Sequence, residues 1–201
     1  ALARFILSRH PDPLKDDPAR FGFKTAEYDS LPGIPPFKWE STRGLGGSFA
    51  YNAQETAADI LSAADLIEYL IDTVAKNGNV LINIGPDSYG HIPVIQQHPL
   101  LGLGDWMKIN GEAIYATRPW IRFKNERGRD LRYTKSDSAL YAIVSGAVAE
   151  SFTIEQPGIP WRSVEVLGAD VVRTEDRDGL LTLVLNKPLA GPAVVVRFSL
   201  R

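Results

Sequence analysis

The sequence contains no cysteine, and this absence removes two classes of site. Without thiols the chain can form neither a disulfide framework nor a thiolate metal centre, and the redox compartment is left undecided. The three histidines, His10, His91 and His98, show no paired-ligand spacing such as HExxH, so we expect no metal. No phosphate-loop lysine and no serine nucleophile elbow are present, and we expect no cofactor.

Long apolar runs and blocks of positive charge are also missing. No run approaches the length that spans a membrane, and the opening run 1–7 is too short for a signal peptide. The formal net charge is −2 and the sequence pI is near 6.0, which argues against nucleic acid or an anionic membrane as partner. We expect a soluble protein, with cytoplasmic and secreted locations both open.

The 201 residues have an ordinary globular composition, 44% hydrophobic and 23% charged, with room for one large or two small domains. The chain opens inside an apolar, strand-like run, so we expect it to be the remainder of something longer.

The first part of the chain predicts an α/β arrangement. Ser62 and Asp65 form a capping-box pattern at the start of a helix that ends at Asn77-Gly78. The next run, 79–84, is apolar at nearly every position and predicts a fully buried parallel strand.

A second helix is expected to begin at Pro93 and to end at Asn110-Gly111, with Pro99 and Gly102 kinking or interrupting it. After Trp120 the pattern changes to short β-rich runs about ten residues apart, which is typical of an antiparallel sandwich. These runs are 130–134, 140–145, 151–154, 164–167, 171–173, 180–185 and 193–200. The expected boundary lies at 118–122 and divides the chain into residues 1–120 and 121–201.

The segment 35–52 is the centre of the functional interpretation. It reads PPFKWESTRGLGGSFAYN, a short strand with Trp39 and Glu40 followed by a glycine-rich loop that closes on Phe49 and Tyr51. Aromatic rings supply stacking surface for a sugar, and glycines let the backbone approach it. The segment predicts one wall of a sugar pocket in a barrel. A buried strand followed by a mobile turn explains the same pattern.

Carboxylates near aromatic residues are the remaining catalytic candidates. Glu27 stands next to Tyr28, and Glu40 next to Trp39. Glycoside hydrolysis uses two carboxyl groups, one that protonates the leaving oxygen and one that attacks or activates water. Apolar, aromatic surroundings raise the pKa of a carboxyl group toward the range that an acid needs near neutral pH. A solvated loop carboxylate or a salt-bridge partner is the alternative for each.

Four segments resemble the α-L-fucosidases of glycoside hydrolase family 29, in the order in which that family has them. They read FKTAEY at 23–28, WESTRGLGGSFAYN at 39–52, NVLINIGP at 79–86 and GEAIYATRPW at 111–120. The resemblance implies a partial (β/α)8-type barrel followed by a C-terminal antiparallel β-sandwich, that is, α/β followed by all-β. Residues 1–120 would be the C-terminal portion of the barrel and 121–201 the sandwich.

The same resemblance implies a retaining exo-fucosidase acting on fucosylated glycans or glycosides. Glu27 would be the acid/base and Glu40 the alternate acid, while Tyr28 and Phe49 would receive the C5 methyl of fucose. Arg9 would contact the sugar, and Trp39 adds stacking surface. The family's aspartate nucleophile lies upstream of everything in this chain.

Because a complete barrel takes about 250 residues, this portion leaves open sheet edges. We therefore expect a homo-oligomer or an N-terminal partner chain. Two rival functions stay open at this point. One is a catalytically inactive, fucose- or carbohydrate-binding or scaffold fragment, and the other is a different glycosidase that uses Glu40 with another carboxylate.

Overall fold

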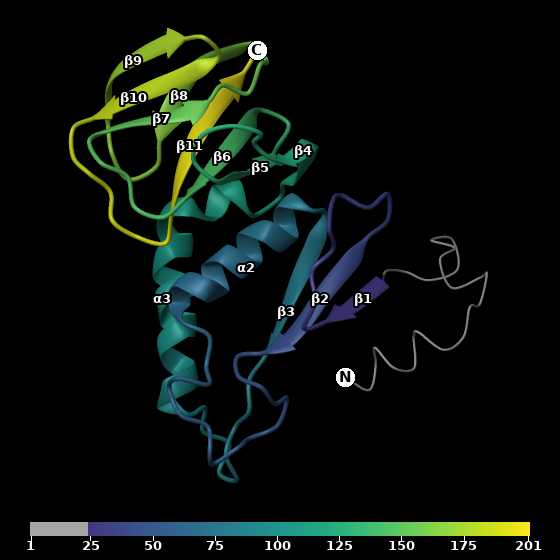
Figure 1. Cartoon of the computed structure of the whole chain (residues 1–201). Coiled ribbons are helices and arrows are strands. Elements are labelled where there is room, and N and C mark those ends of the chain that lie inside the picture. The colour runs from purple at the N-terminus through teal and green to yellow at the C-terminus, as the bar shows by residue number, and fades with distance from the viewer. Residues whose placement is uncertain (1–23) are drawn as a thin grey trace.

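The computed structural model describes residues 24–201, which form a parallel sheet, two long helices and a two-sheet β-sandwich (Figure 1). The parallel sheet has the strand order β1-β2-β3. Its strands are β1 (Lys24–Glu27), β2 (Trp39–Gly44) and β3 (Gly78–Asn83). Helices α2 (Ala63–Ala75) and α3 (Val94–Asn110) lie on one side of this sheet. Parallel strands joined through helices are the repeating unit of a (β/α) barrel, so this part is a portion of such a barrel.

Helix α2 begins and ends where its sequence predicts. The Ser62 hydroxyl accepts from the Asp65 amide, and the Asp65 carboxylate accepts from the Ser62 backbone, which completes the capping box. At the other end Asn77 has a φ of 70°, the left-handed conformation that asparagine tolerates better than most residues. The helix therefore ends at Ala75, and only Lys76 and Asn77 separate it from β3.

Helix α3 is continuous, so the expected interruption at Pro99 and Gly102 is wrong. Pro99 is buried within the helix although proline removes one backbone hydrogen bond there. Gly102 lies against Ala63 of α2, where an added Cβ would come within 2.5 Å of the Ala63 Cβ. The glycine is thus required for the close approach of the two helices.

Strand β3 is covered on one face only, which corrects the expectation of a fully buried strand. Val80 and Ile82 face the helices, whereas Asn79 and Leu81 are exposed, Leu81 by 50%. The strand has β2 on one side, and within the described residues no strand pairs with its other edge. Its apolar composition is typical of a strand covered on both faces, as in a complete barrel.

The C-terminal part is an antiparallel sandwich, as predicted. The five-stranded sheet has the order β4-β5-β6-β11-β8 and the three-stranded sheet the order β7-β10-β9. The strands are β4 (Arg118–Lys124), β5 (Leu131–Lys135), β6 (Ala139–Ser145), β7 (Ser151–Glu155), β8 (Trp161–Val166), β9 (Val171–Arg177), β10 (Leu180–Leu185) and β11 (Ala193–Leu200). All seven predicted β-rich runs overlap strands, but β4 was missed and crosses the expected boundary at 118–122.

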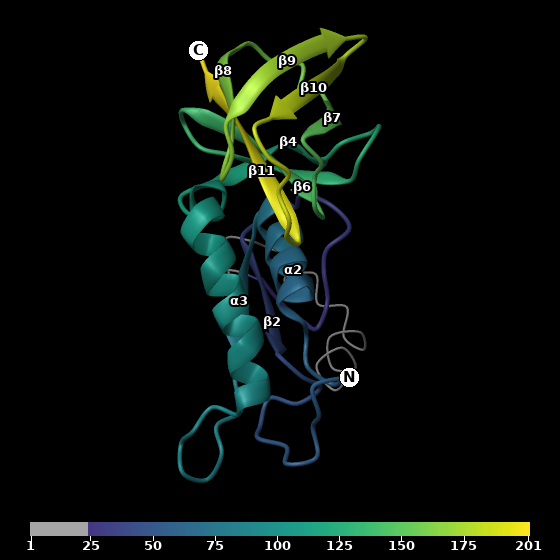
Figure 2. The same cartoon turned by 90° about the vertical axis from the view of Figure 1, so that its left-hand side faces the viewer.

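The sandwich is joined to the helices by a shared apolar core (Figure 2). Ile67 and Ile71 of α2 and Trp106 of α3 pack against the outer face of β6 and β11. The Trp106 indole N–H also donates to the Ala193 carbonyl at 2.9 Å. A short 3-10 turn, η1 (Gly111–Ala113), then leads into β4.

In residues 24–201, no helix is long and apolar enough to cross a bilayer.

Candidate active site

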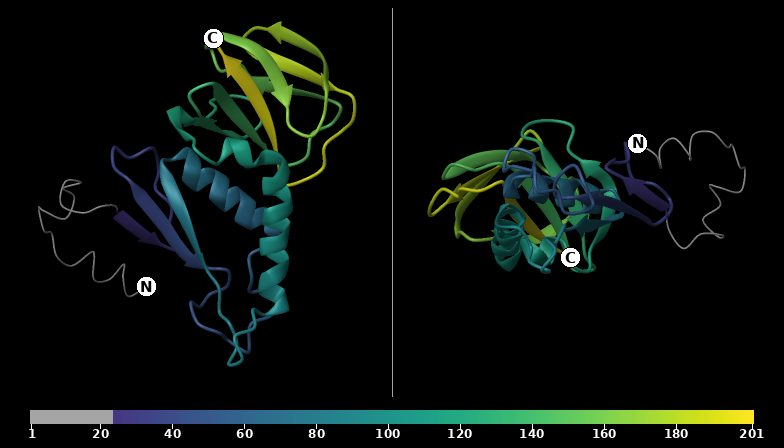
Figure 3. Two further views of the ribbon diagram at one scale, coloured as in Figure 1. Left: turned by 180° about the vertical axis from the view of Figure 1, so that it is seen from behind. Right: turned by 90° about the horizontal axis from the view of Figure 1, so that it is seen from below.

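The loops that follow β2 and β3 lie at the end of the molecule opposite to the sandwich (Figure 3). Because β1, β2 and β3 are parallel, their carboxyl ends meet at this same edge. In (β/α) barrels, active sites are built at the carboxyl ends of the strands. The candidate residues are therefore best judged by their distance from this edge.

Glu27 is the last residue of β1 and lies at the site edge. It is paired in register with Thr42 of β2, and its side chain is exposed. Trp39 and Ser41 of β2 face α2, so alternation along the strand puts Thr42 on the opposite, open face. Glu27 therefore lies on the open face of the sheet, which corresponds to the interior of a barrel.

Glu40 lies on the same face but farther from the edge. It is the second residue of β2 and pairs with Thr25 and Asn79. Its position is two residues before Thr42, which corresponds to about 6–7 Å along the strand. Of the two carboxylates, Glu27 thus has the position that barrel catalysis uses.

Trp39 is a core residue, which corrects the expectation that it adds a stacking surface for the sugar. Its side chain is 1% exposed, and its indole N–H donates to the Lys76 carbonyl at 2.8 Å. The ring fills the space above Gly78, where an added Cβ would come within 2.5 Å of it. Trp39 and Glu40 are neighbours on a strand and point to opposite faces, so only one of them can face the open side.

Tyr28, which follows Glu27 directly in the chain, contacts Phe49. Their ring centroids are 5.3 Å apart in an edge-to-face arrangement, and each residue is 39% exposed. The Tyr28 hydroxyl accepts from the Gly44 amide at 3.0 Å and donates to the Gly46 carbonyl at 3.2 Å. The result is a partly exposed aromatic pair at the site edge, one member of which directly follows Glu27 in the chain.

The glycines of the loop serve the loop itself rather than leaving space for a ligand. A Cβ on Gly44 would come within 2.8 Å of the Tyr28 hydroxyl and would also strike the Ser48 carbonyl. A Cβ on Gly46 would strike the Glu55 carboxylate. Gly47, in contrast, has open space around its Cβ position. The loop is therefore folded tightly back on β2.

Arg43 and Asn83 shape the same edge, although the sequence reasoning gave neither of them a role. The Arg43 guanidinium lies between the rings of Tyr28 and Tyr69, at 5.2 and 5.4 Å from their centroids. The Asn83 amide donates to the Phe49 carbonyl and holds the loop against the end of β3. Both residues stand in segments with a family resemblance, RGLG and NIGP, which was the available signal. Arg9 lies outside the described residues.

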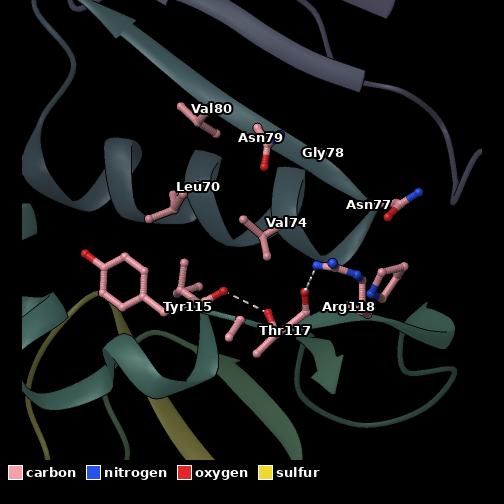
Figure 4. A pocket seen from close by; sticks show the side chains of 12 residues that line it. Leu70, Val74, Asn77, Gly78, Asn79, Val80, Tyr115, Thr117 and Arg118 are labelled. Atoms are coloured by element: carbon pink, nitrogen blue, oxygen red, sulfur yellow. Dashed lines mark hydrogen bonds between the residues drawn. The ribbon is translucent and has the colours of Figure 1, made fainter. Parts of the chain in front are cut away.

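Two hollows formed by the described residues lie away from Glu27. A cavity of about 330 Å³ lies at the amino end of β3, between α2 and residues 114–119 (Figure 4). A second, polar hollow of about 440 Å³ lies behind Arg43, between α2 and β5. Neither contains Glu27 or Phe49, so the described residues form an open wall at the site edge.

In residues 24–201, no three His, Asp or Glu side chains gather as a metal site.

Comparison with known proteins gives a consistent result. The family model described as Alpha-L-fucosidase matches residues 8–112. Tissue alpha-L-fucosidase of Rattus norvegicus is 41% identical over 111 residues, which cover 54% of this chain and 24% of the relative. Thermotoga maritima alpha-fucosidase, solved in complex with a mechanism based inhibitor, is 32% identical with a TM-score of 0.76. That match covers 89% of this chain and 43% of the solved one.

The same enzyme solved in complex with fucose matches with a TM-score of 0.73 and 32% identity, over 89% of this chain and 42% of that one. The chain therefore spans about a quarter of the curated relative and less than half of the solved enzyme. The family model covers more than half of the chain, from residue 8 to residue 112. This chain belongs to the α-L-fucosidase family.

Proposed function

We propose that this chain supplies the acid/base side of a retaining α-L-fucosidase site that removes terminal α-L-fucose from glycans or glycosides. The observation that carries the proposal is Glu27, exposed at the carboxyl end of a parallel strand and followed directly in the chain by Tyr28, whose ring contacts Phe49. Membership of the family supports the reaction class, and the Thermotoga relative was solved with fucose bound.

In this reaction Glu27 donates a proton to the glycosidic oxygen as the bond to the sugar breaks. A second carboxylate attacks the anomeric carbon, and the two carboxyl groups of a retaining enzyme lie about 5–5.5 Å apart. Glu27, then ionised, takes a proton from the water that releases the sugar. The nucleophile is expected from a segment upstream of this chain. Tyr28 and Phe49 present apolar ring surface for the C5 methyl group, and Arg9 is proposed to contact the sugar.

The proposal divides the chain into a C-terminal portion of the barrel, residues 1–120, and a β-sandwich domain, residues 121–201. It also includes association with copies of this chain or with a partner chain that supplies an N-terminal portion. Among the described residues one edge of β3 is unpaired and Leu81 is exposed, and both support association, the edge through free backbone groups and Leu81 through apolar surface.

Glu27→Gln tests the acid/base role in an assembly of this chain that hydrolyses aryl α-L-fucosides. Substrates with poor leaving groups need protonation, so their kcat/KM should fall by about 10²- to 10⁴-fold. Activated aryl fucosides should lose less, and azide should restore part of their rate because it attacks the intermediate without base assistance. Steady-state kinetics over a series of leaving groups measures the effect.

The matched control is Glu126→Gln, an exposed carboxylate on the sandwich that should leave the kinetics unchanged. An equal loss on all substrates without azide rescue would move the role from Glu27 to Glu40. In that case an aryl glycoside panel decides whether the chain is a fucosidase at all.

A catalytically inactive, fucose- or carbohydrate-binding module is the second candidate. The observation that favours it is the Tyr28–Phe49 pair, which can bind a sugar without any nucleophile. Fucose binding without turnover, in every assembly that contains this chain, would support the binding module over the enzyme.

A further inference from the structure

Tyr28 has a backbone conformation that non-glycine residues rarely adopt. Its φ is 50°, directly after Glu27 at the end of β1. Such conformations persist where the surrounding structure fixes them, and they cluster at functional sites. The Tyr28 amide still donates to the Thr42 carbonyl at 3.0 Å, so the pairing with β2 continues through this residue. The unusual φ turns the side chain toward the loop that follows β2, where its hydroxyl is bonded.

The hydroxyl of Tyr28 fastens that loop in two places. It accepts from the Gly44 amide and donates to the Gly46 carbonyl, so both of its hydrogen-bonding functions are used on the backbone. It also occupies the space where a Gly44 side chain would be. The loop carries Phe49, whose ring rests edge-on against the Tyr28 ring. One phenol group therefore connects the strand of Glu27 to the loop of Phe49.

Arg43 holds the Tyr28 ring from behind. Its guanidinium lies 5.2 Å from the Tyr28 centroid and 5.4 Å from that of Tyr69 on α2, and its Nε donates to the Gly44 carbonyl at 3.1 Å. Cation–π contacts of this kind favour one placement of the ring. Arg43 thus holds the ring of Tyr28 in place, and the backbone of Gly44 and Gly46 holds the Tyr28 hydroxyl.

We propose that the Tyr28 hydroxyl is a positioning group that sets the Phe49 ring relative to Glu27 and thereby selects a C5 methyl over a C5 hydroxymethyl group. The inference rests on the proposed function, because it assumes that the pair receives the sugar. A fixed apolar wall leaves the hydroxyl of a galactose-type sugar without a partner. If the Tyr28–Phe49 pair is free to move, it can make room for the C5 hydroxymethyl group, and the site then binds both sugars.

The test compares Tyr28→Phe with the unmodified chain and with Tyr115→Phe, an exposed tyrosine at the opposite end of β3. Tyr28→Phe keeps the ring and removes only the hydroxyl. Amide exchange followed by NMR should show the Gly44 amide exchanging at least about tenfold faster, because its acceptor is gone. Titration with methyl α-L-fucoside and methyl α-L-galactoside should show the preference for the fucoside reduced about threefold or more.

Arg43→Gln is the second variant, used because it leaves the hydroxyl in place and unstacks the ring. It should reduce the same preference. A merely structural role would lower stability and weaken both sugars equally, leaving their ratio unchanged. Gly44 protection and sugar preference that persist in Tyr28→Phe would overturn the inference. If no assembly that contains the unmodified chain binds either sugar, the proposed function fails, and the Gly44 exchange rate alone decides whether the hydroxyl holds the loop.

Discussion

Asp72 connects three segments that are distant in the sequence. Its carboxylate accepts from Lys76 on the same helix at 2.6 Å, from Arg132 on β5 at 2.9 Å and from Ser30 at 3.0 Å. Burial acts to raise the pKa of Asp72, but the hydrogen bonds from Lys76 and Arg132 outweigh it and hold the pKa below its usual range. The residue therefore stabilises the folded state in its charged form.

Asp72→Asn should lower the free energy of unfolding at pH 7 by about 1–3 kcal/mol, because hydrogen bonds to a charged group are lost. A group whose pKa is lowered by folding stabilises the fold above its unfolded pKa, which is about 3.9 for aspartate. The contribution is lost as the pH falls through the lower, folded pKa. Urea denaturation from pH 7 down to pH 3 should show the difference shrinking below about pH 4.

Asp105→Asn is the control for this measurement. Asp105 pairs with Lys108 at 2.7 Å, but both side chains are exposed, and such pairs contribute about 0–1 kcal/mol. A difference for Asp72→Asn that stays constant over the whole pH range would show that its effect comes from packing and not from charge.

Individual residues also show which side-chain contacts can be predicted from the sequence alone and which cannot. Asp72 and Lys76 have the spacing of four that favours an ion pair on a helix, so their contact at 2.6 Å can be read from the sequence. Arg132 could not be predicted, because the contact depends on how the sandwich docks onto α2. Trp39 was expected to line the sugar site, but it is buried. The sequence shows that an aromatic residue stands beside a carboxylate. It does not show which of the two side chains faces the helix.

Among the elements, α2 shows why local signals are dependable. Its start and its end depend on Ser62, Asp65 and Asn77, which act within four residues of the helix ends. Helix α3 was expected to be kinked or interrupted because Pro99 and Gly102 are unfavourable locally. It is continuous, with Pro99 buried and Gly102 packed against Ala63 of the neighbouring helix. Tertiary contacts of this kind carry no signal in the local sequence.

Ser62→Ala should reduce the free energy of unfolding by about 1 kcal/mol, since one helix amide loses its acceptor. Thermal denaturation should show a correspondingly lower Tm. Ser88→Ala, at an exposed loop position after β3, serves as the control and should leave the Tm unchanged. Equal Tm values for both variants would mean that the Ser62 hydroxyl contributes nothing to the stability of α2.

For the whole molecule, the turns between β-rich runs were enough to predict a sandwich, but not the order of its strands. The last strand, β11, lies between β6 and β8, and this pairing joins residues that are far apart in the chain. The barrel portion presents the opposite case. Strands β2 and β3 were expected from their own apolar and aromatic runs, whereas β1 and the extent of the open face became visible only in the structure.

The purified chain should be oligomeric or tightly partnered, and alone it should have little or no α-L-fucosidase activity. Exposed Leu81 on the open face, and the edge of β3 that no strand of residues 24–201 pairs with, favour association because they offer apolar surface and free backbone groups. Light scattering gives the oligomeric state, and a chromogenic fucoside gives the activity. A monomer with normal turnover would contradict both expectations and would indicate that Glu40 serves as nucleophile.

The apolar core shared by the sandwich and the two helices limits how this protein could be shortened. Ile67, Ile71 and Trp106 are buried because β6 and β11 cover them. Trimming the chain back to its barrel portion would uncover these side chains and remove the acceptor of the Trp106 indole. The sandwich is therefore the cover of α2 and α3, and a minimal engineered version of the barrel would have to keep it or replace those apolar positions with polar residues.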